Sequence, residues 1–253
     1  MAKTRPPRTA SPEIYADIYK MFMAPVSAFD CGAKCGEHNN GAPICCSTEA
    51  AIPIVDKHEW KLLKKRTDLW HEYKAPDKAT EKELSDLHHD CVAIECKGFM
   101  SCERENRSMS CRTFPFFPYI DREGDFLGMS VFWGFEDRCW VQSHLQIVNL
   151  RFLTEFVAAY EMLFQVDRDE FTANRDHSAS MRRVFTRHDR PIPLLGRDGH
   201  LYKVTPTTHE IKTARFHEFG RWGFYEKDKP AEPAKHWATL DPNSLKGLTR
   251  ASR

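Results

Sequence analysis

The hydrophobic positions of the chain recur at helical spacing in its second half. Between residues 143 and 166, apolar side chains return every three or four positions, at Leu145, Val148, Phe152, Phe156, Ala159 and Leu163. This spacing places them on one face of a helix and predicts a largely buried helix over 143–166. Residues 167–188 predict a second, more charged helix. Near the N-terminus, Ser11-Pro12-Glu13 combines a capping residue, a first-turn proline and an early acid, which predicts a helix that ends before Pro25.

The alternation of aromatic and polar residues predicts a β-hairpin in the middle of the chain. Its strands are 113–120 and 126–133, and a polar loop containing Gly124 joins them. Cys111 and Cys139 flank the two strands, so the hairpin would bring them towards the same end. Weaker patterns predict helices over 56–74, 80–88 and 208–219 and short strands over 201–204 and 222–225. Residues 30–54 are expected to form a loop, and residues 190–196 a linker.

These elements predict an α+β fold, with a cysteine-rich loop and β-hairpin packed against helices. We expect an N-terminal arm and helix over 1–27 and a cysteine-rich metal-binding module over 28–142. A mostly helical extension follows over 143–226. Residues 227–253 are rich in Pro, Lys and Ala and are expected to form a flexible tail.

Charge and hydropathy narrow the functional class. The chain has 37 Lys and Arg residues against 36 Asp and Glu residues. Such a balance lacks the long-range attraction that nonspecific nucleic-acid binding needs, so no nucleic acid is expected. No apolar run is long enough for a membrane span, and no secretory signal is evident at the N-terminus. We therefore expect a cytoplasmic protein without membrane attachment, whose partner is an unknown protein or small molecule.

Cysteines are the strongest chemical signal in the sequence. Four of the nine lie within 16 residues, from Cys31 to Cys46, and none follows Cys139. A reducing compartment disfavours structural disulfides. The density of thiols therefore indicates ligands of a metal centre that prefers sulfur. The Cys-x2-Cys turns of ordinary zinc sites and the ferredoxin spacing are both absent. Classical dinucleotide, Walker-type and zinc-protease motifs are absent as well.

A family resemblance follows from the order of these cysteines. The series Cys31, Cys35, Cys45-Cys46, then Cys102, Cys111-Arg112-Thr-Phe114-Pro115-Phe116 and Cys139 resembles the cysteine-cluster proteins described as zinc- or iron-chelating. That family includes the flagellin lysine-N-methylases. The resemblance covers roughly residues 28–142 and implies a metal centre built from up to eight cysteines. Ser108 stands where the family usually has proline, and the gap before Cys45 is longer than usual.

The resemblance leaves one of the nine cysteines over. Either Cys91 or Cys96 is extra, and we take Cys91 as the ligand because a more usual gap then separates it from Cys102. The predicted metal ligands are therefore Cys31, Cys35, Cys45, Cys46, Cys91, Cys102, Cys111 and Cys139.

Charged neighbours of the cysteines are further candidates. Several basic residues lie near them in sequence, namely Lys34, Arg104, Arg107, Arg112 and Arg138, and among these Arg112 is expected to stabilise thiolates. His38 is a weaker candidate for an additional ligand. We interpret His88-His89-Asp90 as the polar end of a helix, and the later histidines as surface residues.

Three functional hypotheses follow. The leading one is a metal-binding protein that holds an iron–sulfur cluster or zinc, with iron–sulfur slightly favoured because the Cys-x2-Cys turns are missing. The second is an enzyme, either a redox enzyme or a protein lysine N-methylase built on the same centre. The third is a metal chaperone in which the adjacent pair Cys45-Cys46 exchanges metal.

Overall fold

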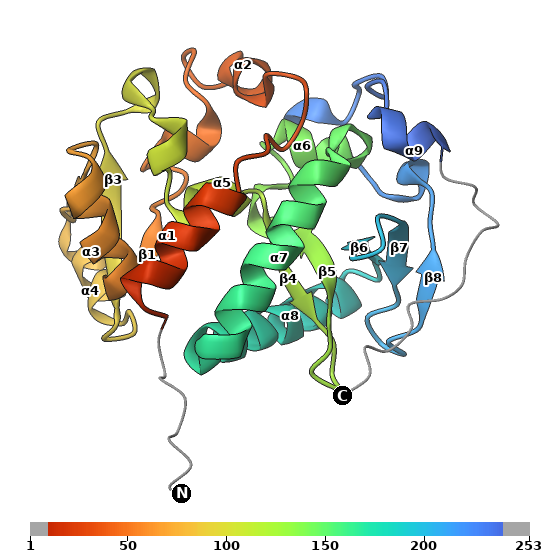
Figure 1. Ribbon diagram of the computed structural model, residues 1–253. Coiled ribbons are helices and arrows are strands. Elements are labelled where there is room, and N and C mark those ends of the chain that lie inside the picture. Colours follow the sequence, from red (N-terminus) through yellow and green to blue (C-terminus); the bar gives the residue numbers. More distant parts are fainter. Residues whose placement is uncertain (1–9, 240–253) are drawn as a thin grey trace, which may run out of the picture.

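A five-stranded antiparallel sheet forms the larger half of the molecule. The computed structural model describes residues 10–239, and in it the strands follow the order β4-β5-β6-β7-β8. They are β4 (Phe116–Ile120), β5 (Phe126–Val131), β6 (Ile192–Gly196), β7 (Leu201–Val204) and β8 (Ile211–Thr213). Two long helices, α7 (Leu150–Val166) and α8 (Arg168–Arg187), pack against this sheet (Figure 1).

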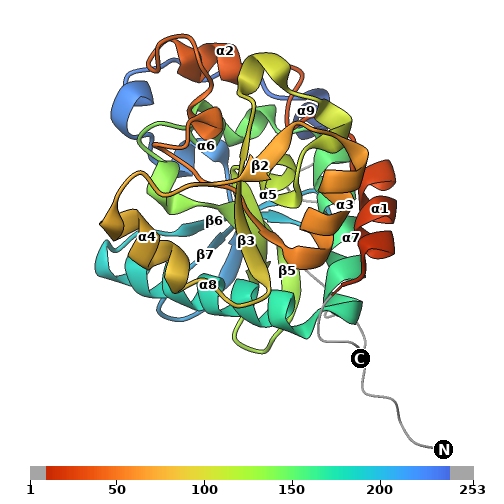
Figure 2. The same ribbon diagram turned by 90° about the vertical axis from the view of Figure 1, so that its left-hand side faces the viewer.

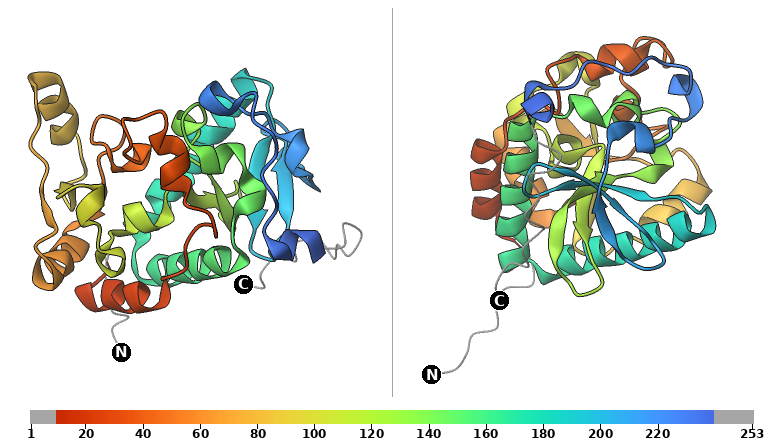
Figure 3. Two further views of the ribbon diagram at one scale, coloured as in Figure 1. Left: turned by 90° about the horizontal axis from the view of Figure 1, so that it is seen from above. Right: turned by 90° about the vertical axis from the view of Figure 1, so that its right-hand side faces the viewer.

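A small three-stranded sheet lies in the other half, with β3 (Cys91–Cys96) between β1 (Ile54–Asp56) and β2 (Trp70–Glu72). Helices α3 (Lys57–Arg66) and α4 (Lys78–Ser85) accompany it (Figure 2). Helix α1 (Pro12–Met21) contacts both α3 and α7, and so joins the two halves. Seen from above in Figure 3, the small sheet and the large sheet lie at opposite sides of the molecule.

Aromatic side chains hold the halves together. Phe22, which follows α1, packs on Phe152 of α7 with ring centroids 5.3 Å apart, and Phe116 of β4 contacts the same ring. All three rings are buried. Burial of apolar area contributes about 25 cal/mol per Å², so this contact between α1, α7 and β4 is a main source of cohesion.

The strongest sequence patterns are confirmed. The fold is α+β, and α1 begins after Ser11 with Pro12 in its first turn. The hairpin is β4 paired with β5, and the predicted helices over 143–166 and 167–188 correspond to α7 and α8. The 143–166 pattern places the start of the first of these helices too early. The short helix α6 (Trp140–Ser143) and a 3-10 turn over Leu145–Ile147 come before α7, which begins at Leu150.

Other predictions are wrong. The helix predicted over 56–74 ends at Arg66, because the residues beyond it become β2 and pair with β3. The predicted linker 190–196 contains β6, and the predicted helix 208–219 contains β8 and a 3-10 turn. Residues 222–225 form a 3-10 turn and not a strand. In each of the first three cases pairing with another strand decided the conformation: β2 pairs with β3, and β6 and β8 both pair with β7.

The segment 30–54, predicted as a loop, also contains helical turns. It includes the short helix α2 (Cys31–Gly36) and a 3-10 turn at Ile44–Cys46. Asp30 caps α2, and its Oδ1 accepts a hydrogen bond from the Ala33 amide over 3.1 Å.

Strands from both sides of position 142 share the large sheet, because β5 pairs with β6. The hairpin predicted as part of a cysteine module is thus continuous with the C-terminal extension, and that extension contributes the strands β6, β7 and β8 besides its helices. Among the described residues, no helix is long and apolar enough to cross a bilayer.

The part of the predicted flexible tail that the structure describes is attached to the body. The Ala234 amide donates to Gln146 O over 2.7 Å, and Trp237 donates from Nε1 to Val148 O over 3.0 Å. The segment ends in α9 (Lys235–Thr239), and residues 240–253 lie outside the described range.

Candidate metal centre

The cysteines gather at one end of the molecule from separate segments of the chain. In Figure 1, α2 and α6 lie at the top, above the ends of the sheets. All nine cysteines are free thiols. Eight of them influence one another electrostatically, and we call this group the cysteine centre: Cys31, Cys35, Cys45, Cys46, Cys96, Cys102, Cys111 and Cys139.

The first half of the centre is built on α2 and the turn that follows. Cys31 and Cys35 stand four residues apart on α2, which places them on one face of the helix. The Ile44 amide donates to Cys35 Sγ over 3.4 Å. This bond fixes the turn carrying Cys45 and Cys46 beside the helix.

Cys45 and Cys46 form a coupled pair. A hydrogen bond between the two sulfurs favours the thiolate on Cys46, and Arg107 adds a favourable charge, so the pKa of Cys46 is lowered to about 7. The same hydrogen bond, together with burial, raises the pKa of Cys45. Cys46 is therefore the thiol that ionises most readily near neutral pH among those with a resolved shift, and a thiolate is the form that binds metal.

The second half of the centre comes from β3 and the loops before β4. Cys96 ends β3, Cys102 follows a 3-10 turn, and Cys111 lies on the short helix α5 (Met109–Thr113). Burial, with smaller contributions from the charges of Cys46 and Cys96, raises the pKa of Cys111 to about 12. A thiol held neutral by burial, among other thiols, gains most from a bound cation that offsets the thiolate charge.

Cys139 closes the centre from the side of the hairpin. It is the residue before α6, and its side chain is buried. Burial raises its pKa to about 12, with smaller contributions from Cys31 and Cys35. Cys111 and Cys139, predicted to meet at one end of the hairpin, both belong to the centre, with different cysteine neighbours.

Cys91 lies apart from the other eight. Its pKa is raised to about 11 by burial, and the charges acting on it are the carboxylates Asp56, Glu170, Asp90 and Asp167, with no cysteine among them. Cys91 and Cys96 occupy opposite ends of β3, five residues or roughly 17 Å apart at strand spacing. The structure therefore brings Cys96, and not the predicted Cys91, to the cysteine centre.

The spacing of the sulfurs bears on which metal fits. Among residues 10–239, the only group of three His, Cys, Asp or Glu side chains with all ligand atoms within 4.8 Å contains no cysteine. Sulfurs on one tetrahedral zinc ion, at 2.3 Å each, lie about 3.8 Å apart. Among the described residues, no three cysteine sulfurs all lie within 4.8 Å of one another.

Arg107 is the main cation of the centre, and Arg104 also lies near Cys102 and Cys31. Its Nε lies 3.1 Å from Cys102 Sγ, and its charge also acts on Cys31, Cys46 and Cys111. The sequence indicated this residue only as one of five basic neighbours. Its position five residues after Cys102, within a short irregular loop, is the signal that could have singled it out.

Arg112, the predicted thiolate partner, has a different role. Its guanidinium is buried and donates to three backbone carbonyls, those of Phe22, Glu105 and Arg107. It also lies over the Tyr19 ring, 4.2 Å from the centroid. No thiol is among the groups that shift its pKa. Arg112 therefore fixes the loop carrying Arg107 and only indirectly supports the centre.

A cavity of about 1690 Å³ extends from the cysteine centre between the two halves of the molecule. One part of its wall carries Cys46, Cys111 and Arg107, and another carries Asp56, Cys91 and Glu170. Burial raises the pKa of Glu170 to about 7. The cavity thus has a thiol-rich region and an acidic region, joined by largely apolar wall.

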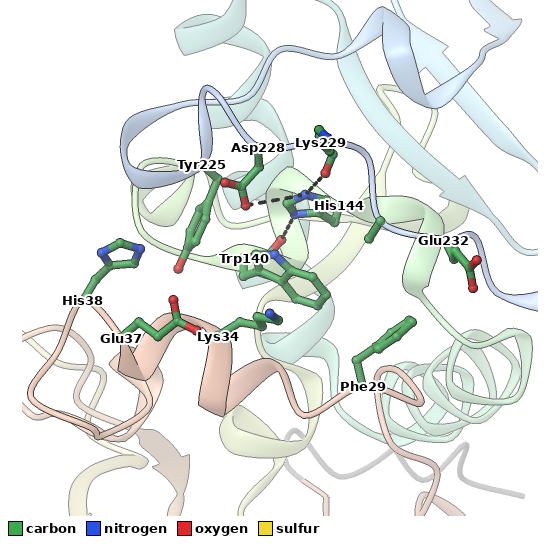
Figure 4. A pocket seen from close by; sticks show the side chains of 11 residues that line it. Phe29, Lys34, Glu37, His38, Trp140, His144, Tyr225, Asp228, Lys229 and Glu232 are labelled. Atoms are coloured by element: carbon green, nitrogen blue, oxygen red, sulfur yellow. Dashed lines mark hydrogen bonds and ion pairs between the residues drawn. The ribbon is translucent and has the colours of Figure 1, made fainter.

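A smaller cavity of about 490 Å³ lies on the far side of α2 (Figure 4). His144 is buried there: its Nδ1 lies 3.0 Å from Trp140 O, and its Nε2 lies 3.4 Å from Lys229 O. Burial corrects the interpretation of the later histidines as surface residues. His38 lines this cavity and stacks on Phe224 with ring centroids 4.3 Å apart, and no thiol is among its described contacts.

Comparison with known proteins identifies no family or relative for this chain. No protein-family model matches the chain, and no curated protein or solved structure matches it.

Proposed function

We propose that the protein binds a metal centre through its cysteine thiolates, as an iron–sulfur cluster or zinc, with iron–sulfur favoured. The observation that carries the proposal is the gathering of eight thiols from separate segments, four of which are near Arg107. The ligand set differs from the sequence prediction by one residue, with Cys96 in place of Cys91. The family resemblance stays a prediction that agrees with this proposal.

Charge supports binding of a metal in this place. Burial raises the pKa of Cys31, Cys111 and Cys139 to between about 11 and 12, so these three thiols are protonated at neutral pH without metal. Metal binding replaces those protons and recovers the cost of burying thiolates. Arg107 offsets part of the remaining negative charge. Iron–sulfur is favoured because the Cys-x2-Cys turns of ordinary zinc sites are missing from the sequence.

Anaerobic purification tests this proposal. An iron–sulfur protein is expected to be brown, to contain iron and acid-labile sulfide, and to bleach in air, whereas a zinc protein is expected to be colourless with stoichiometric zinc. Protein that contains neither metal after anaerobic expression in iron- and zinc-supplemented medium would overturn the proposal.

The large cavity favours an enzyme as the second candidate. A volume of about 1690 Å³ beside the centre leaves room for a substrate, in a redox enzyme or a protein lysine N-methylase. Calorimetry with S-adenosylmethionine tests the methylase, which requires measurable binding. A chaperone is the third candidate, since Cys45 and Cys46 are half-buried. It would yield its metal to a modest chelator without unfolding.

A further inference from the structure

A turn outside the cysteine centre brings three metal-ligating side chains together. His88, His89 and Asp90 lie between α4 and β3, and one ligand atom of each lies within 4.8 Å of the others. The Cys91 amide donates to His88 O over 2.8 Å, and the Asp90 amide donates to His88 Nδ1 over 3.4 Å. These two bonds close the turn and explain why three consecutive side chains gather.

The donor set suits a borderline divalent ion. Two imidazoles and one carboxylate are ligands of Zn²⁺, Co²⁺ and Ni²⁺, and differ from the all-thiolate set of the cysteine centre. Nitrogen and oxygen ligands at about 2.0 Å from a tetrahedral ion lie about 3.3 Å apart. His89 Nε2 already lies 3.1 Å from Asp90 Oδ2, so small side-chain rotations suffice for the third ligand.

The site is accessible to solvent and adjoins the acidic region of the large cavity. The side chain of His89 is 78% exposed. His88 and Asp90 line the cavity, as does Cys91, whose register partner on β1 is Asp56. A cation held at residues 88–90 therefore lies beside carboxylates and a thiol, on the route along the cavity wall to the cysteine centre.

We propose that His88, His89 and Asp90 form a second metal site, which binds a divalent ion such as Zn²⁺ or Co²⁺ from solvent. Its role in capturing metal for the cysteine centre rests on the proposed function, whereas the binding itself does not.

Cobalt titration of the full chain separates the two sites. Cobalt bound by thiolates gives intense near-ultraviolet charge-transfer bands, and cobalt bound by imidazole and carboxylate does not. We expect His88→Ala/His89→Ala to bind one Co²⁺ fewer than the unmodified chain, with the charge-transfer bands unchanged. The matched control His58→Ala/His71→Ala changes two histidines of the same half and is expected to retain every equivalent.

A double variant that binds as many Co²⁺ ions as the unmodified chain would overturn the second site. Failure of the cysteine centre has a different signature, namely absent charge-transfer bands with one weakly absorbing equivalent retained. Paramagnetic broadening by Ni²⁺ in the unmodified chain avoids dependence on folding of the variant. Selective broadening of the His88 and His89 ring signals is expected, and broadening that spares both contradicts the proposal.

Discussion

Arg107 donates a hydrogen bond from its Nε to the sulfur of Cys102 over 3.1 Å. The same guanidinium favours the thiolate of Cys46, although Cys46 is 61 positions earlier in the chain (107 − 46). One arginine therefore links the early cysteines on the α2 side to the later ones near β4. It is held in place by Arg112, whose Nε binds the Arg107 carbonyl over 2.8 Å.

Replacing Arg107 by Gln is expected to make Cys46 less reactive in the metal-free protein. Arg107 lowers the pKa of Cys46, which is about 7, so its loss raises that pKa and reduces the thiolate fraction at neutral pH. A rise of about half a unit slows alkylation by iodoacetamide roughly twofold at pH 7. Mass spectrometry of the Cys46 peptide over time measures this rate.

Arg138→Gln is the control for this variant. Arg138 also adjoins a cysteine in sequence, but it binds Asp137 over 2.8 Å. Alkylation of Cys46 is expected to be unaffected there. Equal slowing of alkylation in both variants would contradict the claim that the charge of Arg107 favours the Cys46 thiolate.

The metal centre should depend on cysteines from both halves. Cys111→Ser is expected to empty the site about as completely as Cys46→Ser, because the charge of Cys46 acts on Cys111 across the centre. Cys91→Ser is the internal control and should retain the metal content of the unmodified chain, whereas Cys96→Ser should lose it. Metal analysis after anaerobic purification measures all four. Full metal content in Cys111→Ser would contradict a centre shared between the two halves.

The sequence predicts that the cysteines bind metal, but it does not predict which of them lie together in the fold. The density of thiols from Cys31 to Cys46 predicts a metal centre without any knowledge of the fold. Whether Cys91 or Cys96 joins it depends on the direction of β3, which carries its two ends to opposite regions. That direction is set by pairing with β1 and β2, whose short sequences contain no pattern of their own.

The secondary structure shows the same difference between elements set by nearby residues and elements set by pairing with other strands. Helices α1 and α7 follow from capping and periodicity, because the interactions that form them lie within one turn. Strand β2 was missed because its partner lies far along the chain, with Cys96 opposite Trp70, and β6 was missed because it lies between distant β5 and nearby β7. Arg112 was misassigned since proximity to Cys111 in sequence says nothing of the direction its side chain takes on α5.

Arg112→Met is expected to destabilise the fold severely. Three carbonyls lose their donor, those of Phe22, Glu105 and Arg107. A buried group without a partner costs about 1–3 kcal/mol, so a loss of about 3 kcal/mol or more is expected from urea unfolding of the metal-free protein. Arg66→Met serves as the control, because Arg66 makes fewer such bonds at a more exposed place. A loss below about 1 kcal/mol would mean that these bonds do not hold the loop.

The buried carboxyl of Glu59 should make stability depend on pH. Its Oε1 accepts hydrogen bonds from Tyr19 Oη over 2.5 Å and from the Met109 amide over 2.6 Å. Both favour the ionised form, yet burial outweighs them and raises the pKa from 4.5 to about 7. The folded state thus binds a proton that the unfolded state releases between these two values.

Stability conferred by protonated Glu59 is therefore complete below pH 4.5 and lost as pH rises through 7, up to about 3 kcal/mol. Glu59→Gln should flatten this decline in urea unfolding of metal-free protein between pH 5 and 8. A residual slope is expected, because burial also raises the pKa of Glu170 to about 7. Glu83→Gln, on the exposed helix α4, should leave the full slope in place. Parallel curves for Glu59→Gln and the unmodified chain would show that Glu59 is ionised in the fold throughout this range.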